Sequence, residues 1–346
     1  LIIWASVATI LLIGVVGYEV LRAYGKLNLA SKSVTSSPMM AAEGSSENYA
    51  TLDNSIEWQD DWIRYNGDIY EYNKDITTFL IMGIDKEDEV KIVEEGTDGG
   101  QADALFLLVF NPHEEKIKVI GINRNSMTDV DIYDEYGNYV TTVIAQIAVQ
   151  HGFGNGVEES CEYQVKAVSN LFYQLPIHGY AAINMSAIAT INDSIGGVSV
   201  KVLEDLTKWD DSLKKGEMVH LEGESAFTYV KTRDMNEYGS SDMRYERQKQ
   251  YLNAFIAAAR LASKDDPKLA IDIYNAISSQ MTTNISIDEI SYLVSSTDGY
   301  SFESDDLITI DGQNTMGEEF EEFYIDEEDL YDKFINVFYE KVEGLD

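Results

Sequence analysis

The stretch Thr77-Thr-Phe-Leu-Ile-Met-Gly-Ile-Asp85 is a near-continuous apolar run that ends at a carboxylate. Two runs of the same kind follow, Ala104-Leu-Phe-Leu-Leu-Val-Phe110 and Ile117-Lys-Val-Ile-Gly-Ile-Asn123, and the turn sequence Asn111-Pro-His-Glu-Glu115 joins them. Short apolar runs bounded by turn residues predict strands of a sheet that is buried on both faces. These three strands are the predicted centre of the fold.

Helical spacing of apolar residues occurs between and after these strands. We expect helices over Val140 to His151, Cys161 to Leu175, Ala181 to Ser194 and Met243 to Leu261, with a return to strand after Gly196. Because strands and helices interleave along the chain, the pattern predicts an α/β/α sandwich with a central mixed sheet.

The C-terminal part, residues 265–346, continues this pattern as an acidic extension. We expect helices over Leu269 to Met281 and Ile287 to Val294, and a strand at Leu307 to Ile310. The segment from Glu318 to the end predicts an acidic amphipathic helix. Its inward face would carry Leu330, Phe334, Val337 and Phe338.

Composition excludes several classes of function. The chain has 25 Lys and Arg against 61 Asp and Glu, a formal net charge of −36, and this field repels a polyanion. We therefore expect no nucleic-acid partner. One Cys and 4 His exclude disulfide scaffolds, zinc fingers and iron–sulfur clusters, so any metal site is expected to have oxygen ligands.

The first residues predict a membrane anchor. Leu1 to Tyr18 contains no charged residue, which predicts a transmembrane helix within residues 1–22. A cleaved signal peptide is the alternative, although its apolar region would be shorter, roughly 7–15 residues. Residues 23–55 are rich in Ser and small residues and predict a solvated stalk. The globular domain is expected over residues 56–346.

Positive charge is concentrated in one short part of this acidic chain. The basic residues there are Lys231, Arg233, Arg244, Arg247 and Lys249. One face of the predicted helix carries Arg244, Arg247, Gln248 and Tyr251. With Ser241 or Asp242 as its cap, the positive end of this helix would place arginines where they bind an anion such as phosphate. The alternative is a solvated face with Glu237 and Glu246 as ion-pair partners.

Charged residues also stand at the ends of the three predicted strands. Asp85 follows the first strand, Asp103 precedes the second, and Arg124 follows the third. Functional side chains often lie where loops meet the end of a rigid sheet. Two carboxylates without thiols suit Mg²⁺ or Mn²⁺ bound through substrate phosphates.

In order and spacing, the motifs over residues 77–261 resemble those of the LytR-CpsA-Psr family. They are Phe79-Leu-Ile-Met-Gly-Ile-Asp85, Ala102-Asp103-Ala-Leu, Asn111-Pro, Ile122-Asn-Arg124, Ile195-Gly-Gly-Val-Ser-Val, Leu221-Glu-Gly-Glu-Ser-Ala-Phe-Thr-Tyr-Val-Lys-Thr-Arg233 and Asp242-Met-Arg244-Tyr-Glu-Arg247-Gln248. This family consists of membrane-anchored bacterial ligases with an extracellular α/β/α domain. They are taken to move a glycopolymer such as teichoic acid or capsular polysaccharide from a polyprenyl pyrophosphate carrier to peptidoglycan, forming a phosphodiester with help from Mg²⁺.

The resemblance implies a single-pass protein of the cell membrane with the same activity and partners. It implies that Asp85 and Asp103 hold Mg²⁺ or Mn²⁺ against the pyrophosphate. Arg124, Arg233, Arg244 and Arg247 would neutralise the charge of the pyrophosphate, and the substrate-binding set would be Gln248, Lys231, Asp242 and Gln101. Asp103 or Asp242 would serve as the base for the acceptor hydroxyl, and the strand Leu105 to Phe110 would line an apolar channel for the lipid.

Three residues depart from the family pattern: Gln101 and Lys231 stand where the family has Arg, and Asn125 stands where it has Asp. A lost charge-assisted contact in a dry site costs about 2–3 kcal/mol in the transition state. Lys86 or Lys91, in the glycine-rich loop 86–101, could replace the missing cation. Two alternatives follow: a catalytically degenerate relative that binds polyprenyl phosphate or glycan, and a lipid-linked pyrophosphatase.

Overall fold

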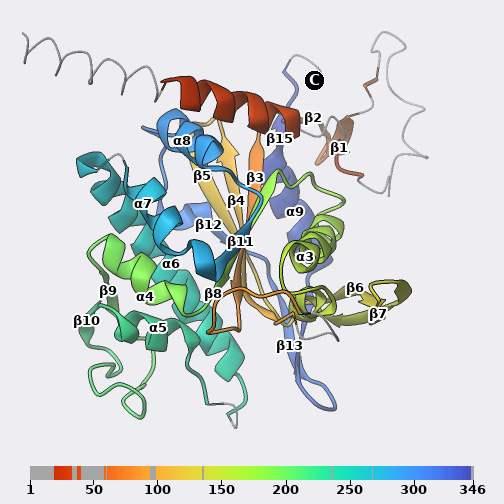
Figure 1. Ribbon diagram of the computed structural model, residues 1–346. Helices are drawn as coiled ribbons and strands as arrows, with labels where there is room; N and C mark the ends of the chain where they lie inside the picture. The colour runs from red at the N-terminus through yellow and green to blue at the C-terminus, as the bar shows by residue number, and fades with distance from the viewer. Residues whose placement is uncertain are drawn as a thin grey trace, which may run out of the picture.

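The computed structural model describes residues 19–32, 37–39, 58–59, 61–93, 99–134, 136–234, 237–266 and 268–343. Its centre is a six-stranded mixed sheet of order β11-β8-β3-β4-β5-β12 (Figure 1). The strands are β3 (Thr77–Ile84), β4 (Ala102–Asn111), β5 (Lys116–Ile122), β8 (Gly179–Asn184), β11 (Met281–Thr283) and β12 (Leu307–Thr309). The three strands predicted from apolar runs are therefore confirmed, and they form the middle of the sheet.

The pairing of these strands places their ends. β4 is antiparallel to both β3 and β5, whereas β8 is parallel to β3 and β12 is parallel to β5. The carboxyl ends of β3 and β5 and the amino end of β4 consequently lie at one edge of the sheet, and this edge carries the residues described below.

Helices cover the sheet on both sides (Figure 1). One side packs on α3 (Glu158–Leu171) and α9 (Glu327–Phe338), and the other faces α6 (Ser240–Asp265), α7 (Leu269–Ala276) and α8 (Ile287–Ser296). The prediction of a mixed α/β fold with a central mixed sheet is confirmed. The inward face predicted for the terminal helix is also confirmed, because all four of its apolar residues are buried: Leu330, Phe334, Val337 and Phe338.

A second apolar cluster forms around α6. It contains β9 (Val198–Lys201), β10 (Met218–Leu221) and α5 (Glu224–Lys231), with α4 (Ala187–Ser194) packed beside them. Smaller sheets join β1 (Trp62–Tyr65), β2 (Asp68–Tyr72) and β15 (Tyr339–Lys341), and pair β13 (Gly312–Met316) with β14 (Glu321–Ile325). Short 3₁₀ helices occupy Ile147–Phe153, Ser278–Gln280 and Ser304–Asp306.

Several predicted helices are wrong in part. Residues 140–146 belong to β7 (Tyr139–Gln146), which pairs with β6 (Met127–Tyr133) in an exposed hairpin. The run of β-branched residues Val140 to Ile144 explains this, because such side chains favour a strand. The predicted helix from Ala181 divides into β8 and α4. The helix predicted from Glu318 begins at Glu327, because residues 321–325 form β14, which pairs with β13 in a hairpin that the sequence analysis missed.

Residues 19–32 form a helix that lies along α8. The side chain of Leu29 is buried against Phe79 and Ile285, and Lys32 pairs with Glu289 of α8 at 2.8 Å. The expectation of a solvated stalk is therefore wrong for residues 24–32. Most of the predicted anchor, residues 1–18, lies outside the described residues, and among the described helices none is both long and apolar enough to cross a membrane.

Candidate active site

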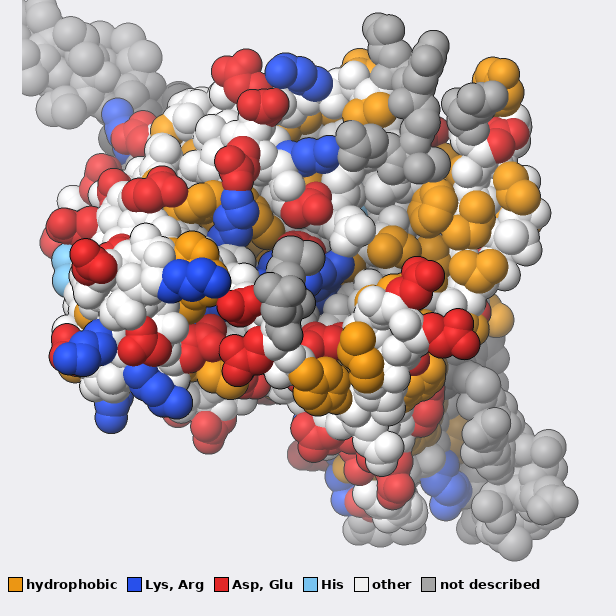
Figure 2. Space-filling model, turned by 90° about the horizontal axis from the view of Figure 1, so that it is seen from below, with side chains coloured by type: hydrophobic (Ala, Val, Ile, Leu, Met, Phe, Trp, Pro, Cys, Tyr) orange, Lys and Arg blue, Asp and Glu red, His pale blue; other side chains and the backbone are white. Residues whose placement is uncertain are grey.

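The edge of the sheet brings together the charged residues predicted at the strand ends. Asp85 follows β3, Asp103 is the second residue of β4, and Arg124 follows β5. The first turns of α6 add Arg244, which contacts Asp103. Figure 2 shows this edge of the molecule, where Lys and Arg side chains gather in a hollow surrounded by acidic residues.

Asp103 is the centre of this group. Its Oδ1 lies 3.1 Å from Nε of Arg124, and its Oδ2 accepts a hydrogen bond of 2.8 Å from Nη1 of Arg244. The exposed fractions of the three side chains are 10% for Asp103, 12% for Arg124 and 6% for Arg244. Arg124 also donates from Nη2 to Oε1 of Gln101 at 2.5 Å. The predicted residues Asp103, Arg124, Arg244 and Gln101 thus form one contiguous buried network.

The arginines outnumber the carboxylate that they share. Burial lowers the pKa of Arg124, Asp103 opposes this effect, and the charges of Arg244 and Arg233 lower the pKa further. The pKa of Arg233 is lowered mainly by burial and then by Arg244. Moreover, Nη2 of Arg244 is buried without a hydrogen-bond partner among the described residues. Three guanidinium groups around one carboxylate, with a buried donor left over, form a site whose charge and hydrogen-bonding groups favour an anion.

Asp85 lies beside this network, on its Lys231 side. Its Oδ1 accepts a hydrogen bond of 2.6 Å from the backbone N–H of Gln101. Burial raises the pKa of Asp85, the Gln101 hydrogen bond opposes the rise, and the charge of Asp103 adds to it. The pKa of Lys231 is lowered by burial while the charge of Asp85 opposes this, and Lys231 pairs with Glu87. Asp85 therefore lies between a carboxylate and a cation.

Lys86 approaches the same place over Gly100. A Cβ at Gly100 would lie 3.0 Å from Cε of Lys86 and 3.1 Å from Oδ1 of Asp85, and the φ of +83° at Gly100 favours glycine there. Of the two lysines named as replacements for the missing cation, Lys86 thus packs beside Asp85. Lys91 lies with its backbone carbonyl near Gly156.

Arg247 and Gln248 have different surroundings from Arg244. The Arg247 side chain is 0% exposed, and its Nε lies 2.8 Å from Oε1 of Glu204. Its other guanidinium nitrogens donate to the backbone carbonyls of Tyr229 and Thr232. Gln248 donates to the carbonyl of Val230 at 3.2 Å. Both side chains therefore hold the segment that precedes Arg233.

The first turn of α6 differs from its prediction. The N-cap is Gly239, with a φ of 80°, and not Ser241 or Asp242. The backbone N–H of Gly239 donates to Oε1 of Glu321 at 2.7 Å, a residue that the sequence analysis missed because it comes from the unpredicted hairpin. Arg244, Arg247 and Gln248 are all buried, so the alternative of a solvated helix face is wrong.

Asp242 is the one further carboxylate of the predicted set. It accepts a weak hydrogen bond of 3.5 Å from Nδ2 of Asn123. Burial raises its pKa, the Asn123 hydrogen bond opposes the rise, and the charges of Glu321 and Glu246 add to it. Its carboxylate is therefore a better proton acceptor than an ordinary aspartate.

Small residues on the sheet face below these charges allow neighbouring side chains to approach closely. Gly83 pairs with Ala104, and Phe106 pairs with Gly121, all on the side of α6. A Cβ at Gly121 would lie 2.4 Å from the Tyr245 hydroxyl, which is buried without a hydrogen-bond partner among the described residues. Farther along the same face Leu108 and Phe110 are only half-buried, whereas Leu105 and Leu107 on the opposite face are fully buried.

Comparison with known proteins decides the family. The model of the LytR_cpsA_psr family matches residues 26–336, which is most of the chain. The chain belongs to the LytR-CpsA-Psr family.

Relatives of known name support this membership. The chain is 27% identical over 215 residues to a polyisoprenyl-teichoic acid–peptidoglycan teichoic acid transferase TagU of Halalkalibacterium halodurans, which covers 62% of this chain and 63% of the relative. A TagU of Bacillus anthracis is 28% identical over 213 residues, covering 62% of each chain. The alignments thus span somewhat less than two thirds of these relatives.

Solved structures of the family share the fold. TagV of B. subtilis superposes with a TM-score of 0.57 at 23% identity, covering 76% of this chain and 95% of that one. TagT bound to LIIa-WTA gives a TM-score of 0.55 at 22% identity, covering 77% and 91%. At this level of identity the similarity establishes the fold of this family member and not its substrate.

The structure gives each departure from the family pattern a defined place. Gln101 accepts from Arg124 and donates its backbone N–H to Asp85, so it connects the two carboxylate regions. Asn125 donates from Nδ2 to Oγ of Ser241 at 3.2 Å and accepts from Gln146 at 2.9 Å. The Asn125 amide thereby ties the segment after β5 to the start of α6.

Proposed function

We propose that this protein transfers a glycopolymer from a polyprenyl pyrophosphate carrier to peptidoglycan through a phosphodiester bond, as an enzyme of cell-wall assembly. The observation that carries the proposal is the buried arginine group around Asp103, in which Nη2 of Arg244 has no hydrogen-bond partner among the described residues. The names of the TagU relatives support the glycopolymer class and the peptidoglycan acceptor.

The proposed reaction breaks the phosphoanhydride bond of the carrier and forms a phosphate ester to the acceptor. The acceptor hydroxyl attacks the phosphorus that carries the glycopolymer. The bond from this phosphorus to the oxygen that bridges the two phosphates breaks, and polyprenyl phosphate leaves. The hydroxyl proton passes to a carboxylate. Asp242 suits this role better than Asp103, because both oxygens of Asp103 are held by arginines whereas the pKa of Asp242 is raised.

The proposed role of the arginines is to neutralise the negative charge of the pyrophosphate. Arg124, Arg233 and Arg244 stabilise the negative charge that builds on the pyrophosphate oxygens, in a site where burial strengthens each contact. Arg247 and Gln248 are assigned a positioning role, since their polar atoms contact Glu204 and the backbone of residues 229–232. Lys231 and Gln101 are assigned to substrate binding and to the support of Arg124.

We propose that a divalent cation binds beside the arginines. Among the described residues no group of three or more His, Cys, Asp or Glu could hold a metal, so the protein would supply only Asp85 and Asp103. Mg²⁺ takes few protein carboxylates and completes its coordination with water and phosphate oxygens. Burial and, to a smaller extent, the charge of Asp103 raise the pKa of Asp85, and a bound cation would offset both effects. Such an ion would supply further neutralisation of the pyrophosphate.

We infer the position of the membrane relative to the site from the direction of β3. The helix of residues 19–32 packs beside Phe79 near the start of β3, and Asp85 follows its end. A strand of 8 residues separates these ends by about 26 Å. With a single-pass anchor in residues 1–22 and an extracellular domain, the lipid would run along the half-buried face of Leu108 and Phe110 to reach the arginines.

A transfer assay with product analysis tests the function. The full chain is incubated with Mg²⁺, a short-chain polyprenyl pyrophosphate glycan and peptidoglycan, and the phosphate-linked glycan on peptidoglycan is measured. Release of soluble glycan phosphate in its place would identify a lipid-linked pyrophosphatase. Donor binding without either product would identify a degenerate relative.

A further inference from the structure

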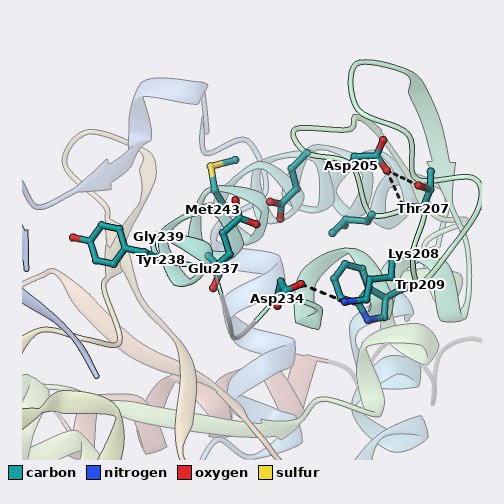
Figure 3. A pocket seen from close by; sticks show the side chains of 12 residues that line it. Asp205, Thr207, Lys208, Trp209, Asp234, Glu237, Tyr238, Gly239 and Met243 are labelled. Carbon is teal, nitrogen blue, oxygen red and sulfur yellow. Dashed lines mark hydrogen bonds and ion pairs between the residues drawn. The ribbon is translucent and has the colours of Figure 1, made fainter. Parts of the chain in front are cut away.

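A cavity of about 250 Å³ lies next to the arginine network, on the far side of the first turn of α6. One wall is the loop that follows β9, with Glu204, Asp205 and Trp209, and the other is the start of α6. Figure 3 shows Glu237 and Met243 on one side of this cavity and Asp205, Thr207 and Trp209 on the other, while the ring of Tyr238 points away.

The charge of the cavity excludes an anion. Glu204, Asp205, Asp234 and Glu237 line it against a single cation, Lys208. Lys208 pairs with Asp234 at 3.2 Å, and its Nζ lies 4.7 Å from the centre of the Trp209 ring. Hydrogen bonds from Thr207 lower the pKa of Asp205, which keeps this carboxylate ionised. The pyrophosphate and the cavity ligand must therefore be different groups.

The cavity carries groups that recognise hydroxyls and an apolar ring face. Trp209 keeps 42% of its surface exposed. Ser240 also lines the cavity, is only 7% exposed, and its Oγ is buried without a hydrogen-bond partner among the described residues. Buried hydroxyl groups almost always form a hydrogen bond, so a polar ligand atom in the cavity would supply the partner of Ser240. Ionised carboxylates are strong acceptors for ligand hydroxyls.

The cavity is coupled to the transfer site by two short connections. Ser240 and Met243 precede Arg244 on α6, and Glu204 of the cavity wall pairs with Arg247. Four residues of helix correspond to a rise of about 6 Å, so Ser240 in the cavity wall and Arg244 are about one helical turn apart.

From this arrangement we infer that the cavity is a subsite for an uncharged pyranose of a glycan, with Trp209 as the stacking surface and Glu237 and Ser240 as hydroxyl partners. The inference rests on the proposed function for its place in the reaction. The sugar belongs either to the donor glycopolymer next to the pyrophosphate or to the peptidoglycan acceptor, and the test separates these two sources.

Glycan binding is measured first, without lipid donor and without Mg²⁺, so that it does not depend on transfer. The probe is tetra-N-acetylchitotetraose, titrated into the full chain by calorimetry. We expect saturable binding that Trp209→Ala weakens at least tenfold and Glu237→Gln severalfold, and that Trp209→Phe retains in part. Tyr136→Ala, which removes an aromatic 79% exposed in the β6–β7 hairpin, is the control and should bind as the wild type does.

Absence of saturable binding by the wild type, or equal affinity of the wild type and a folded Trp209→Ala variant, would overturn the inference. In the transfer assay, a raised KM for peptidoglycan in Trp209→Ala would identify the acceptor as the source, and a raised KM for the lipid-linked glycan would identify the donor. Failure of all transfer by the wild type would contradict the proposed function while leaving the binding result to decide the subsite.

Discussion

Nη1 of Arg244 donates to Oδ2 of Asp103 at 2.8 Å, although 141 positions separate the two residues in the chain. This contact joins the first turns of α6 to the amino end of β4. It also fixes the direction of a guanidinium group whose second terminal nitrogen has no hydrogen-bond partner among the described residues. Under the proposed function, the pair defines where the negative charge of the substrate would be bound.

Loss of Arg244 should abolish most of the transfer activity. We expect Arg244→Ala to lower kcat by about 10²–10³, the usual effect of removing one donor to a developing anion. Arg260→Ala is the matched control on the same helix, because Arg260 donates to the carbonyl of Tyr300. The measurement is the rate of phosphodiester formation. Equal rates for the two variants would show that Arg244 does not contact the reacting phosphate.

Arg247 should matter more for folding than for substrate binding. Removing one partner of a buried ion pair costs about 3–5 kcal/mol, so Arg247→Met should lower the free energy of unfolding by this amount. The double variant with Glu204→Gln should recover part of the loss, since no unpaired charge then remains buried. Urea unfolding at neutral pH measures both. A fully stable Arg247→Met variant that no longer binds polyprenyl pyrophosphate would assign Arg247 to the substrate instead.

Asp85 should make stability fall as pH rises. Its pKa in the folded protein is raised from the usual 3.8, chiefly by burial, so the unfolded chain releases this proton first. Ionisation above pH 3.8 therefore destabilises the fold, and Asp85→Asn should be more stable than the wild type at neutral pH and equal to it well below pH 3.8. Thermal unfolding across this range is the measurement.

Two further measurements belong with the Asp85 variant. Mg²⁺ should stabilise the wild type but not Asp85→Asn. Asp134 gives a control of opposite sign, because hydrogen bonds from Asn138 lower its pKa, so Asp134→Asn should lose stability at neutral pH. If Asp85→Asn were less stable than the wild type at neutral pH, the result would contradict the prediction, because the ionised carboxylate would then be stabilised by its contacts and not destabilised by burial.

Gln101→Arg restores the charge that the family pattern has at this position. Gln101 already accepts from Arg124 and supports Asp85, so we expect the variant to change the rate of transfer less than about tenfold. Gln101→Ala, which removes the acceptor of Arg124, is the companion variant and should be the slower of the two. If the wild type were inactive and Gln101→Arg were active, the result would support the alternative that this protein is a catalytically degenerate relative.

The elements that sequence reasoning placed correctly depend on burial. Continuous apolar runs predicted β3, β4 and β5, because these strands are covered on both faces. The run from Val140 to Ile144 was misassigned because it is an exposed strand, in which apolar spacing reports little about packing and β-branching decides.

The sequence predicted which residues lie together at the site, but not which partner each side chain contacts. The sequence shows that Arg244 and Arg247 share a helix face, yet the direction of each guanidinium depends on partners far along the chain. Arg244 turns to Asp103, and Arg247 turns to Glu204. Nothing in the sequence indicated that Glu321 lies at the site. Its contact with Gly239 depends on a hairpin in an acidic stretch for which the sequence predicts a helix.

The most direct test of the central claim is thermal stabilisation of the full chain by a short-chain polyprenyl pyrophosphate. A ligand that binds only the folded state raises the unfolding temperature by an amount that increases with the ratio of ligand concentration to Kd. We predict a shift that Mg²⁺ increases, that Arg260→Ala retains and that Arg244→Ala loses. No shift for the wild type at saturating ligand, or an equal shift in Arg244→Ala, would contradict a pyrophosphate site built by the arginines around Asp103.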